Sequence, residues 1–286
     1  MSAEQIRPID RLSALLARFR VHARLFHAGA LCGRTNLPAE PGRGFLHVLR
    51  EGELVVKHRA GSGAPRRIEL TEPTLLFYPR PVTHEFVHAP GEGPNLVCAA
   101  LDFDGGASHP LVRALPPLLA LPLKSVQGME HTLELLFAEA ERVRCGQRLL
   151  ADRLFEVLLV QLLRWLLDHP AEAGLPAGLL TGLSHPKLAR TLTALHEQPG
   201  APWSLQSMAD TAGMSRSAFA TAFREWVGQT PAEYLLKWRV SIAQTLLRDG
   251  APIKSVGDQL GYASASSLSR AFTQAVGVSP RAWLRQ

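Results

Sequence analysis

The last part of the chain, residues 204–286, contains two copies of one pattern. Gly213 in the first copy matches Gly261 in the second at an offset of 48 residues, whereas Phe223 matches Phe272 at an offset of 49. The second copy therefore carries one additional residue in its turn. Two copies of a single supersecondary unit are the simplest explanation of this spacing.

Each copy has the signals of two helices joined by a short turn. A small residue, Ala209 or Gly257, precedes the turn glycine by four positions and permits close packing of the helices. The glycine can adopt the left-handed conformation, and a serine then caps the next helix: Ser215 in the first copy and Ser264 in the second. These signals predict helix-turn-helix motifs over residues 205–226 and 253–276.

A third helix is predicted between the two copies. Thr230, Pro231 and Glu233 supply an N-cap, a proline at the first helical position and the return acceptor of a capping box, while Asp249 and Gly250 stop the helix. About 18 residues at 1.5 Å each give a spacer of about 27 Å. Successive major grooves on one face of DNA lie about 34 Å apart, so such a spacer suits a chain that reads two adjacent grooves.

With these motifs, the C-terminal part resembles the AraC/XylS family of bacterial transcription regulators over about one hundred residues. Two positions depart from the family pattern, since Gly257 replaces the usual alanine and Leu268 the usual phenylalanine; both keep size or apolar character. The matching positions are Leu205, Met208, Ala209, Ala212, Gly213, Met214, Ser215, Phe219, Phe223, Gly228, Thr230, Pro231, Tyr234, Leu235, Arg239, Ala243, Leu246, Ile253, Gly261, Tyr262, Ser264, Arg270, Ala271, Phe272, Gly277, Ser279 and Pro280.

The resemblance implies that the second helix of each copy contacts DNA. The charge agrees with this, because residues 185–286 hold 11 Lys and Arg against 6 Asp and Glu, whereas residues 1–184 hold 20 against 19. Arg216 and Arg270 are expected to contribute most to the recognition of the DNA base sequence, since a guanidinium can donate two hydrogen bonds to guanine. The expected DNA-binding residues are Arg216, Ser217, Ala220, Thr221 and Arg224 in the first copy, and Ser264, Ser266, Ser267, Arg270 and Thr273 in the second.

The N-terminal part, residues 1–124, predicts a short helix over residues 10–18 and then a sandwich or barrel of short strands. Residues 44–50 and 53–59 are expected to form a hairpin around Glu51 and Gly52. Further strands are expected over residues 19–28, 66–70, 74–78, 84–88 and 95–103, with glycine and proline clusters between some of them.

This part resembles, more loosely, the cupin barrel that many AraC-type regulators carry as a sensor. The resemblance rests on residues 45–48, 51–54 and 71–79 and on His84. Metal-binding cupins place two histidines one residue apart, but His47 is followed two positions later by Leu49. We therefore assign no metal or other cofactor, and a metal site made by His47 and His84 stays open as an alternative.

The three cysteines, Cys32, Cys98 and Cys145, form neither an even framework nor a metal-type spacing, which is typical of a reducing cytosol. Some cupin-bearing members of the family sense oxidants through cysteine. Cys98 is expected to be inert in a buried strand. Our hypothesis is that Cys32, with His27 and Arg34 near it in sequence, is the more reactive thiol. The candidate sensor residues are Cys32, His47, His84 and Cys98.

Helices are predicted over residues 129–144 and 148–168, and residues 169–184 resemble a linker rich in proline, glycine and alanine. Leucines surround much of the second helix, so more than one of its faces must be covered. A second protomer or the rest of the same chain could cover them, and the resemblance favours a homodimer. Its longest apolar run is interrupted by Gln161 and Arg164, so we expect no membrane span.

These observations predict an α+β multidomain protein: a cupin-like antiparallel β-barrel (1–124), a helical connector with linker (125–184), and an all-α domain with two helix-turn-helix motifs (185–286). The function implied is a DNA-binding transcription regulator, by family analogy an activator, which acts on double-stranded DNA with RNA polymerase and answers a small-molecule or redox effector. One alternative is redox sensing through Cys32. Another is a metal-dependent cupin enzyme, but the incomplete ligand set and the absence of known catalytic motifs favour a non-enzyme. No signal-peptide pattern begins the sequence, so a cytoplasmic location is expected.

Overall fold

The computed structural model describes residues 9–88 and 93–285. The expectation about a signal peptide falls partly on residues 1–8, outside this range. The described residues form two compact units, one made of residues 20–176 and the other of residues 9–19 together with 177–285.

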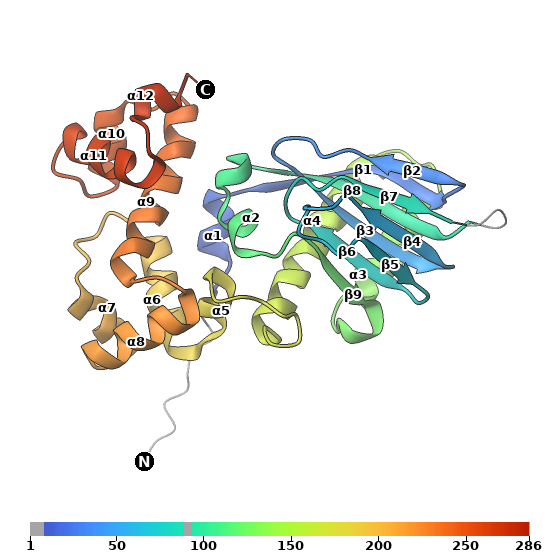
Figure 1. The fold of residues 1–286 in the computed structure, drawn as a ribbon, viewed down its shortest axis with the longest axis horizontal. Helices are drawn as coiled ribbons and strands as arrows, with labels where there is room; N and C mark the ends of the chain where they lie inside the picture. The colour runs from blue at the N-terminus through green and yellow to red at the C-terminus, as the bar shows by residue number, and fades with distance from the viewer. Residues whose placement is uncertain (1–8, 89–92, 286) are drawn as a thin grey trace, which may run out of the picture. The chain divides into compact units, whose positions relative to one another are not determined.

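The first unit contains two antiparallel sheets that face each other as a barrel-like sandwich (Figure 1). The five-stranded sheet has the order β1-β8-β3-β6-β9, and the four-stranded sheet has the order β2-β7-β4-β5. The strands are β1 (Val21–Ala30), β2 (Arg34–Leu37), β3 (Arg43–Glu51), β4 (Leu54–His58), β5 (Arg67–Leu70), β6 (Thr74–Tyr78), β7 (His84–Val87), β8 (Asn95–Phe103) and β9 (Leu119–Pro122).

The expected hairpin of residues 44–50 and 53–59 is wrong, although both strands exist. β3 pairs with β6 and β8, whereas β4 pairs with β5 and β7 in the other sheet. Gly52 lies where the chain crosses between the sheets, with φ +89°, and a Cβ there would lie 2.8 Å from Cα of Pro94. A crossing between sheets and a hairpin have the same local turn chemistry, so the sequence could not separate them.

Apolar side chains from both sheets fill the interior. β6 is buried along its whole length, and β4 alternates, with Leu54, Val56 and His58 facing inward. The core contains Leu31, Leu37, Phe45, Leu49, Leu54, Val56, Leu70, Leu76, Tyr78, Val82, Phe86, Leu96, Cys98 and Ala100. The interior is therefore apolar except for a few histidines and one tyrosine hydroxyl.

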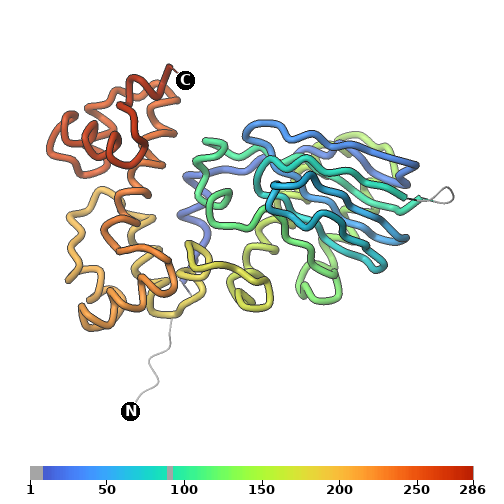
Figure 2. Tube along the Cα trace, in the orientation of Figure 1, coloured from blue at the N-terminus to red at the C-terminus, as the bar shows by residue number. Residues whose placement is uncertain are grey.

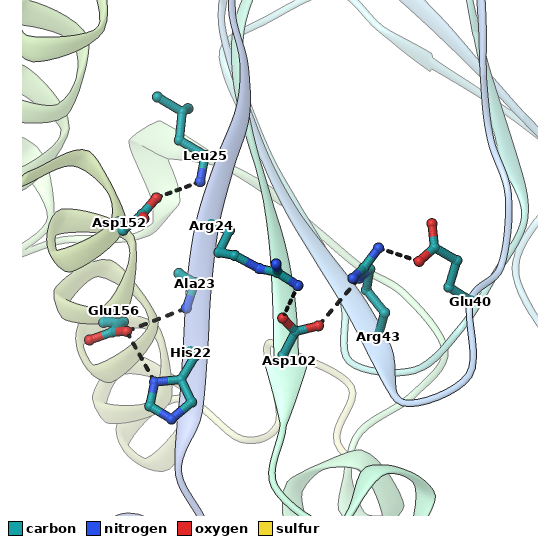
Figure 3. A network of polar contacts seen from close by, with 9 residues as sticks. All are labelled: His22, Ala23, Arg24, Leu25, Glu40, Arg43, Asp102, Asp152 and Glu156. Atoms are coloured by element: carbon teal, nitrogen blue, oxygen red, sulfur yellow. Dashed lines mark hydrogen bonds and ion pairs between the residues drawn. The ribbon is translucent and has the colours of Figure 1, made fainter. Parts of the chain in front are cut away.

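The long helix α4 (Gln147–Asp168) covers the edge strand β1, and carboxylate side chains of α4 accept hydrogen bonds from main-chain amides of β1 (Figure 3). The amide of Leu25 donates to Asp152 Oδ1 at 2.6 Å, and the amide of Ala23 donates to Glu156 Oε1 at 3.4 Å. Two outward amides of an edge strand are thereby satisfied by side chains, which removes two positions where another strand could pair.

Figure 3 also shows an ion-pair network on the same sheet. Asp102 of β8 lies 2.5 Å from Arg24 of β1 and 3.3 Å from Arg43 of β3, and Arg43 also pairs with Glu40. These side chains are partly exposed, so each pair contributes at most about 1 kcal/mol.

Short helices complete the first unit around the sheets. α3 (Glu130–Ala140) packs against α4; α3 lies within the predicted range 129–144, and α4 begins at Gln147, one residue before the predicted range 148–168. The remaining elements of this unit are η1 (Gly106–Ser108), α2 (Pro110–Ala114) and η2 (Leu123–Ser125).

The second unit is all helical. Figure 2 shows other helices of this unit gathered at both ends of the long helix α9 (Pro231–Arg248). α9 has 18 residues, begins with the Thr230 cap and ends before Asp249 and Gly250, which confirms the predicted spacer. The other helices are α1 (Ser13–Arg18), α5 (Leu179–Ser184), α6 (Pro186–Glu197), α7 (Leu205–Ala212), α8 (Arg216–Val227), α10 (Ile253–Gln259), α11 (Ala265–Val276) and α12 (Pro280–Trp283).

Two segments of this unit differ from the sequence-based expectation. Part of the expected linker, residues 179–184, forms the buried helix α5, because its leucines pack inside the unit. The first helix, α1, lies in this unit although it precedes the barrel in sequence. Arg18 donates to the carbonyl of His196 at 3.2 Å, and the Phe19 ring lies 5.1 Å from that of Trp238. Main-chain and aromatic contacts, invisible in the sequence, fix both segments.

Within the described part of the chain, no helix combines the length and the apolar character that crossing a membrane requires.

Candidate nucleic-acid interface and barrel interior

The two helix-turn-helix copies share one turn geometry. Gly213 and Gly261 both adopt the left-handed conformation, with φ +62° and +74°. The next amide closes the turn onto the residue four before each glycine: Met214 donates to the carbonyl of Ala209 at 3.0 Å, and Tyr262 donates to that of Gly257 at 2.9 Å. Because five sequence positions separate donor from acceptor in both, the two copies close this turn in the same way, and the additional residue of the second copy lies between Gly261 and its cap, Ser264.

The second helix of each motif is the one expected to contact DNA and is called its reading helix. The first reading helix, α8, is capped by Ser215, whose hydroxyl accepts from the amide of Ala218 at 3.3 Å. Its inward face carries Phe219 and Phe223, both fully buried. Of the five predicted DNA-binding residues in this copy, Arg216, Ser217, Thr221 and Arg224 are exposed, and Ala220 is half-buried. The structure thus brings these five residues to the outward side of one helix.

The second reading helix, α11, is capped by a reciprocal serine pair. Ser264 Oγ accepts from the amide of Ser267, and Ser267 Oγ accepts from the amide of Ser264, each at 3.1 Å. Ser267 Oγ also donates to the carbonyl of Ser264 at 2.7 Å, so its hydroxyl is occupied by the helix start. Ser264, Ser266, Arg270 and Thr273 are exposed and Ser267 is half-buried, while the two positions on the inner side, Leu268 and Phe272, are fully buried.

An open groove of about 880 Å³ lies beside the first reading helix within this unit. Thr221, Arg224 and Ala220 of α8 line it together with residues of α9. Two further lining residues, Arg239 and Tyr262, match the family pattern, and the sequence predicts no DNA-binding role for either. Arg239 lies on α9, and Tyr262 follows the turn glycine of the second copy.

The interior of the barrel brings His47 and His84 together. Their Nε2 atoms lie 3.0 Å apart, and both rings are buried. His84 Nδ1 donates to the carbonyl of Val82 at 2.8 Å, so in the neutral ring Nε2 is the acceptor and His47 Nε2 donates to it. Nδ1 of His47 is then an unprotonated acceptor, and no donor among the described residues reaches it.

Burial holds these rings neutral. Loss of solvation, together with the neighbouring His84, lowers the pKa of His47 well below its usual 6.5. Loss of solvation also lowers the pKa of His84 to about 4, against an opposing hydrogen bond to Val82.

A second polar pair in this interior was not predicted from the sequence. His58 accepts from the Tyr78 hydroxyl at 2.9 Å, and the Tyr78 ring stacks on that of His84 with centroids 4.2 Å apart. Burial lowers the pKa of His58 and raises that of Tyr78. The alternation of Leu54, Val56 and His58 along β4 places His58 on the inward face, so this alternation could have revealed a buried histidine at that position.

The barrel interior offers two histidine nitrogens to a metal ion and no further ligand among the described residues. The two are Nε2 of His47 and of His84, whereas Leu49, two positions after His47, is an apolar residue of the core. No group of three or more His, Cys, Asp or Glu side chains among the described residues is arranged to hold one.

The two candidate sensor cysteines are not together. Cys98 is buried and lies opposite His47 on the adjacent strand, and burial raises the pKa of its thiol. Cys32 is exposed in the connection between β1 and β2, as predicted for a loop. Cys145 is also exposed. The structure therefore groups His47, His84 and Cys98, and leaves Cys32 apart.

Known proteins resemble both units. Residues 10–168 match the family described as cupin, and residues 208–286 match the family described as a helix-turn-helix domain. An AraC-like transcription regulator of Streptomyces lividans is 34% identical over 193 residues, which are 66% of this chain and 63% of that protein. The transcriptional regulator AlkR of Acinetobacter baylyi is 34% identical over 62% of this chain and 58% of its own length. This chain thus spans less than two thirds of both relatives.

A third relative is matched over more of its length. The RCS-specific transcriptional activator RclR of Escherichia coli is 28% identical over 72% of this chain and 73% of its own length. Among solved structures, the DNA-binding domain of AdpA in complex with a target DNA matches 34% of this chain and 88% of that domain, at 28% identity and a TM-score of 0.32. The chain therefore belongs to the cupin family over residues 10–168, and its residues 208–286 match the helix-turn-helix domain family, an order of domains for which the relatives are named AraC-like transcription regulators.

Proposed function

We propose that this protein is a sequence-specific DNA-binding transcription regulator whose barrel receives the controlling signal. One observation carries the proposal: two equivalent helix-turn-helix motifs stand at the ends of one rigid helix, each with a polar outer face on its second helix. The second helices of the two motifs, held on a spacer of about 27 Å, fit two adjacent major grooves of DNA. This arrangement favours a DNA-binding role over an enzymatic one. We accordingly propose no enzymatic reaction.

Sequence discrimination is assigned to the outward residues of α8 and α11. Arg216 and Arg270 are exposed and have the donor geometry that recognises guanine. The serine hydroxyls at the start of α11 already serve the helix cap, so Ser264 and Ser267 are better suited to positioning or phosphate contact than to reading a base. The remaining lysines and arginines would neutralise phosphates, and affinity should then fall with salt.

The effector is a small molecule that enters the barrel. A cavity of about 220 Å³ is lined by Phe26, His27, Leu31, Thr35, Leu37, Phe86 and Cys98. The lining is mostly apolar, and Cys98 in it lies opposite His47 of the neutral pair His47 and His84. Such surroundings favour a small uncharged ligand over an ion. The name of the E. coli relative, a transcriptional activator, supports activation as the direction of control, and RNA polymerase is the protein partner that we propose.

A homodimer in the cytoplasm is the assembly that we propose. Leu135 of α3 and Leu149, Leu150 and Val157 of α4 are large apolar side chains that stand 60, 63, 49 and 47% exposed. Two helices of the connector thus have uncovered apolar surface, which a second copy of the chain would bury.

The proposal is tested by capturing sheared genomic DNA with the purified full chain at near-physiological salt and sequencing what is retained. The expected result is a small number of sharp peaks with a common bipartite site, lost when Arg216 and Arg270 are both replaced by alanine. The capture is repeated with a cell extract that contains small metabolites. Uniform capture of DNA by the wild-type protein and by the double variant under both conditions would show that the helical unit binds DNA only through phosphates.

A further inference from the structure

Arg239 joins three parts of the helical unit that are distant in sequence. It lies on α9 and is half-buried. Its Nε donates to the carbonyl of Pro199 at 2.7 Å, and its Nη2 donates to the carbonyl of Ala201 at 3.0 Å. Its guanidinium carbon also lies 5.5 Å from the centre of the Tyr262 ring. A planar fork that grips two carbonyls and faces an aromatic ring has a fixed orientation.

The two carbonyls belong to the segment that enters the first helix-turn-helix motif. Residues 198–203 lead directly to Ser204, the N-cap of α7. The segment is held by its own bonds, because the Trp203 indole donates to the carbonyl of Gln198 at 2.8 Å and Pro199 is buried. Arg239 therefore ties the spacer helix to the start of the first motif.

The same segment presses against the turn of the second motif. A Cβ on Gly200 would lie 2.4 Å from the carbonyl oxygen of Gln259, and a Cβ on Gly261 would lie 2.2 Å from that of Gly200. The contact is backbone against backbone, so it has almost no freedom to adjust. Tyr262, the ring that faces Arg239, is the residue directly after Gly261.

We propose that Arg239 is a positioning residue that fixes the second reading helix relative to the first and thereby sets the base-pair spacing between the two half-sites read by one chain. This inference rests on the proposed function. The spacer helix fixes the distance between the two motifs. The rotation of the second motif about the axis of that helix is set by the lateral contacts of Gly261 and Tyr262 with residues 198–203 and Arg239. One base pair moves a half-site by about 3.4 Å and turns it by about a tenth of a helical turn, so a loosened grip must show as tolerance of spacing.

The experiment uses the full chain and duplexes that carry the captured bipartite site with its native spacing, with one base pair inserted or deleted, or with the first half-site alone. Arg239→Met removes the two carbonyl bonds and keeps the length of the stem. Arg239→Lys keeps the charge but not the fork, and Arg190→Met removes an exposed arginine of α6 as a matched control.

Wild-type protein and R190M should prefer native spacing over either altered spacing by about tenfold or more, which is about 1.4 kcal/mol. R239M should lose about tenfold on native spacing, bind the altered spacings as wild type does, and keep wild-type affinity for the single half-site. R239K should resemble R239M. An unchanged spacing preference in R239M would overturn the inference, as would an equal loss on the single half-site, which indicates general destabilisation.

If R239M does not fold, Tyr262→Leu replaces it, because that change removes the ring and the hydroxyl that interact with Arg239 and leaves both carbonyl bonds. Y262L should also broaden the spacing preference, and an unbroadened preference would overturn the inference. Failure of the proposed function has a different signature, since wild-type protein itself would then show no specific site.

Discussion

The Nε2 atoms of His47 and His84 lie 3.0 Å apart inside the barrel, in a hydrogen bond that needs at least one of the two nitrogens unprotonated. The pKa of His84 is lowered to about 4 from 6.5, and that of His47 is lowered as well. The unfolded chain therefore binds more protons than the folded chain between about pH 6.5 and 4. The stability contribution of the neutral pair is complete above pH 6.5 and is lost as the pH falls through this window.

Lowering the pH from 7.5 to 5 should reduce the free energy of unfolding of the barrel by about 2 kcal/mol for each such histidine. Urea unfolding followed by circular dichroism at both pH values measures this. The double variant His47→Leu/His84→Leu should show a smaller difference between the two pH values, whereas His131→Leu, with a side chain that is 96% exposed, should leave it unchanged. An equal difference in the double variant would refute the assignment.

Arg270→Ala should weaken binding to the specific site by about 1–3 kcal/mol and relax the base preference at one position. The reason is that the exposed guanidinium on α11 can donate two bonds to one guanine. Fluorescence anisotropy with the specific site, its single-base variants and random DNA measures the effect. Lys254→Ala removes the same charge from the neighbouring helix α10 and should keep the base preference. Equal loss on specific and random DNA would make Arg270 a phosphate contact.

Asp152→Ala should destabilise the barrel unit by about 1–3 kcal/mol, because it leaves the partly buried amide of Leu25 without an acceptor. Asp152→Asn retains an acceptor oxygen and should recover most of that loss. The free energy of unfolding in urea reports both changes. Glu172→Ala, an exposed carboxylate, serves as the control. If D152A and E172A unfold at the same urea concentration, the edge-strand contact contributes nothing.

Replacement of Leu150 and Val157 by serine should convert a dimer into a monomer. These side chains lie seven positions apart on α4, so they share one helix face, and they are half-exposed. Sedimentation velocity at micromolar concentration should show a wild-type dimer and a monomeric double variant. Val143→Ser, at a position 94% exposed between α3 and α4, should remain dimeric. A monomeric wild-type protein would contradict the proposed assembly.

Cys32 should react with a thiol reagent faster than Cys145, while Cys98 should stay unlabelled in the folded protein. Cys98 is 1% exposed and its pKa is raised, which keeps the thiol protonated. Cys32 and Cys145 are both exposed, so access alone does not rank them, and the ranking depends on the basic residues near Cys32. Mass spectrometry after timed labelling decides it. Equal rates at Cys32 and Cys145 would leave redox sensing through Cys32 without support.

Local sequence was enough wherever a single turn or helix start decides the structure. Thr230, Pro231 and Glu233 start α9 through side chains that reach only their own helix end, and Gly213 and Gly261 take a conformation that glycine adopts at little cost. The repeat of these signals at an offset of 48 residues before the turn and 49 after it determined the two motifs and their spacer. The buried and exposed sides of α8 and α11 followed from helical period alone.

Only the tertiary structure decided which distant segments meet. The strand pattern was visible in residues 44–59, but the partners of β3 and β4 depend on pairing with strands far along the chain. The same holds for His58 beside Tyr78, and for Arg239, whose two carbonyl acceptors lie about forty positions away. Periodicity records whether a residue is buried, whereas its neighbour is set by the packing of the whole domain.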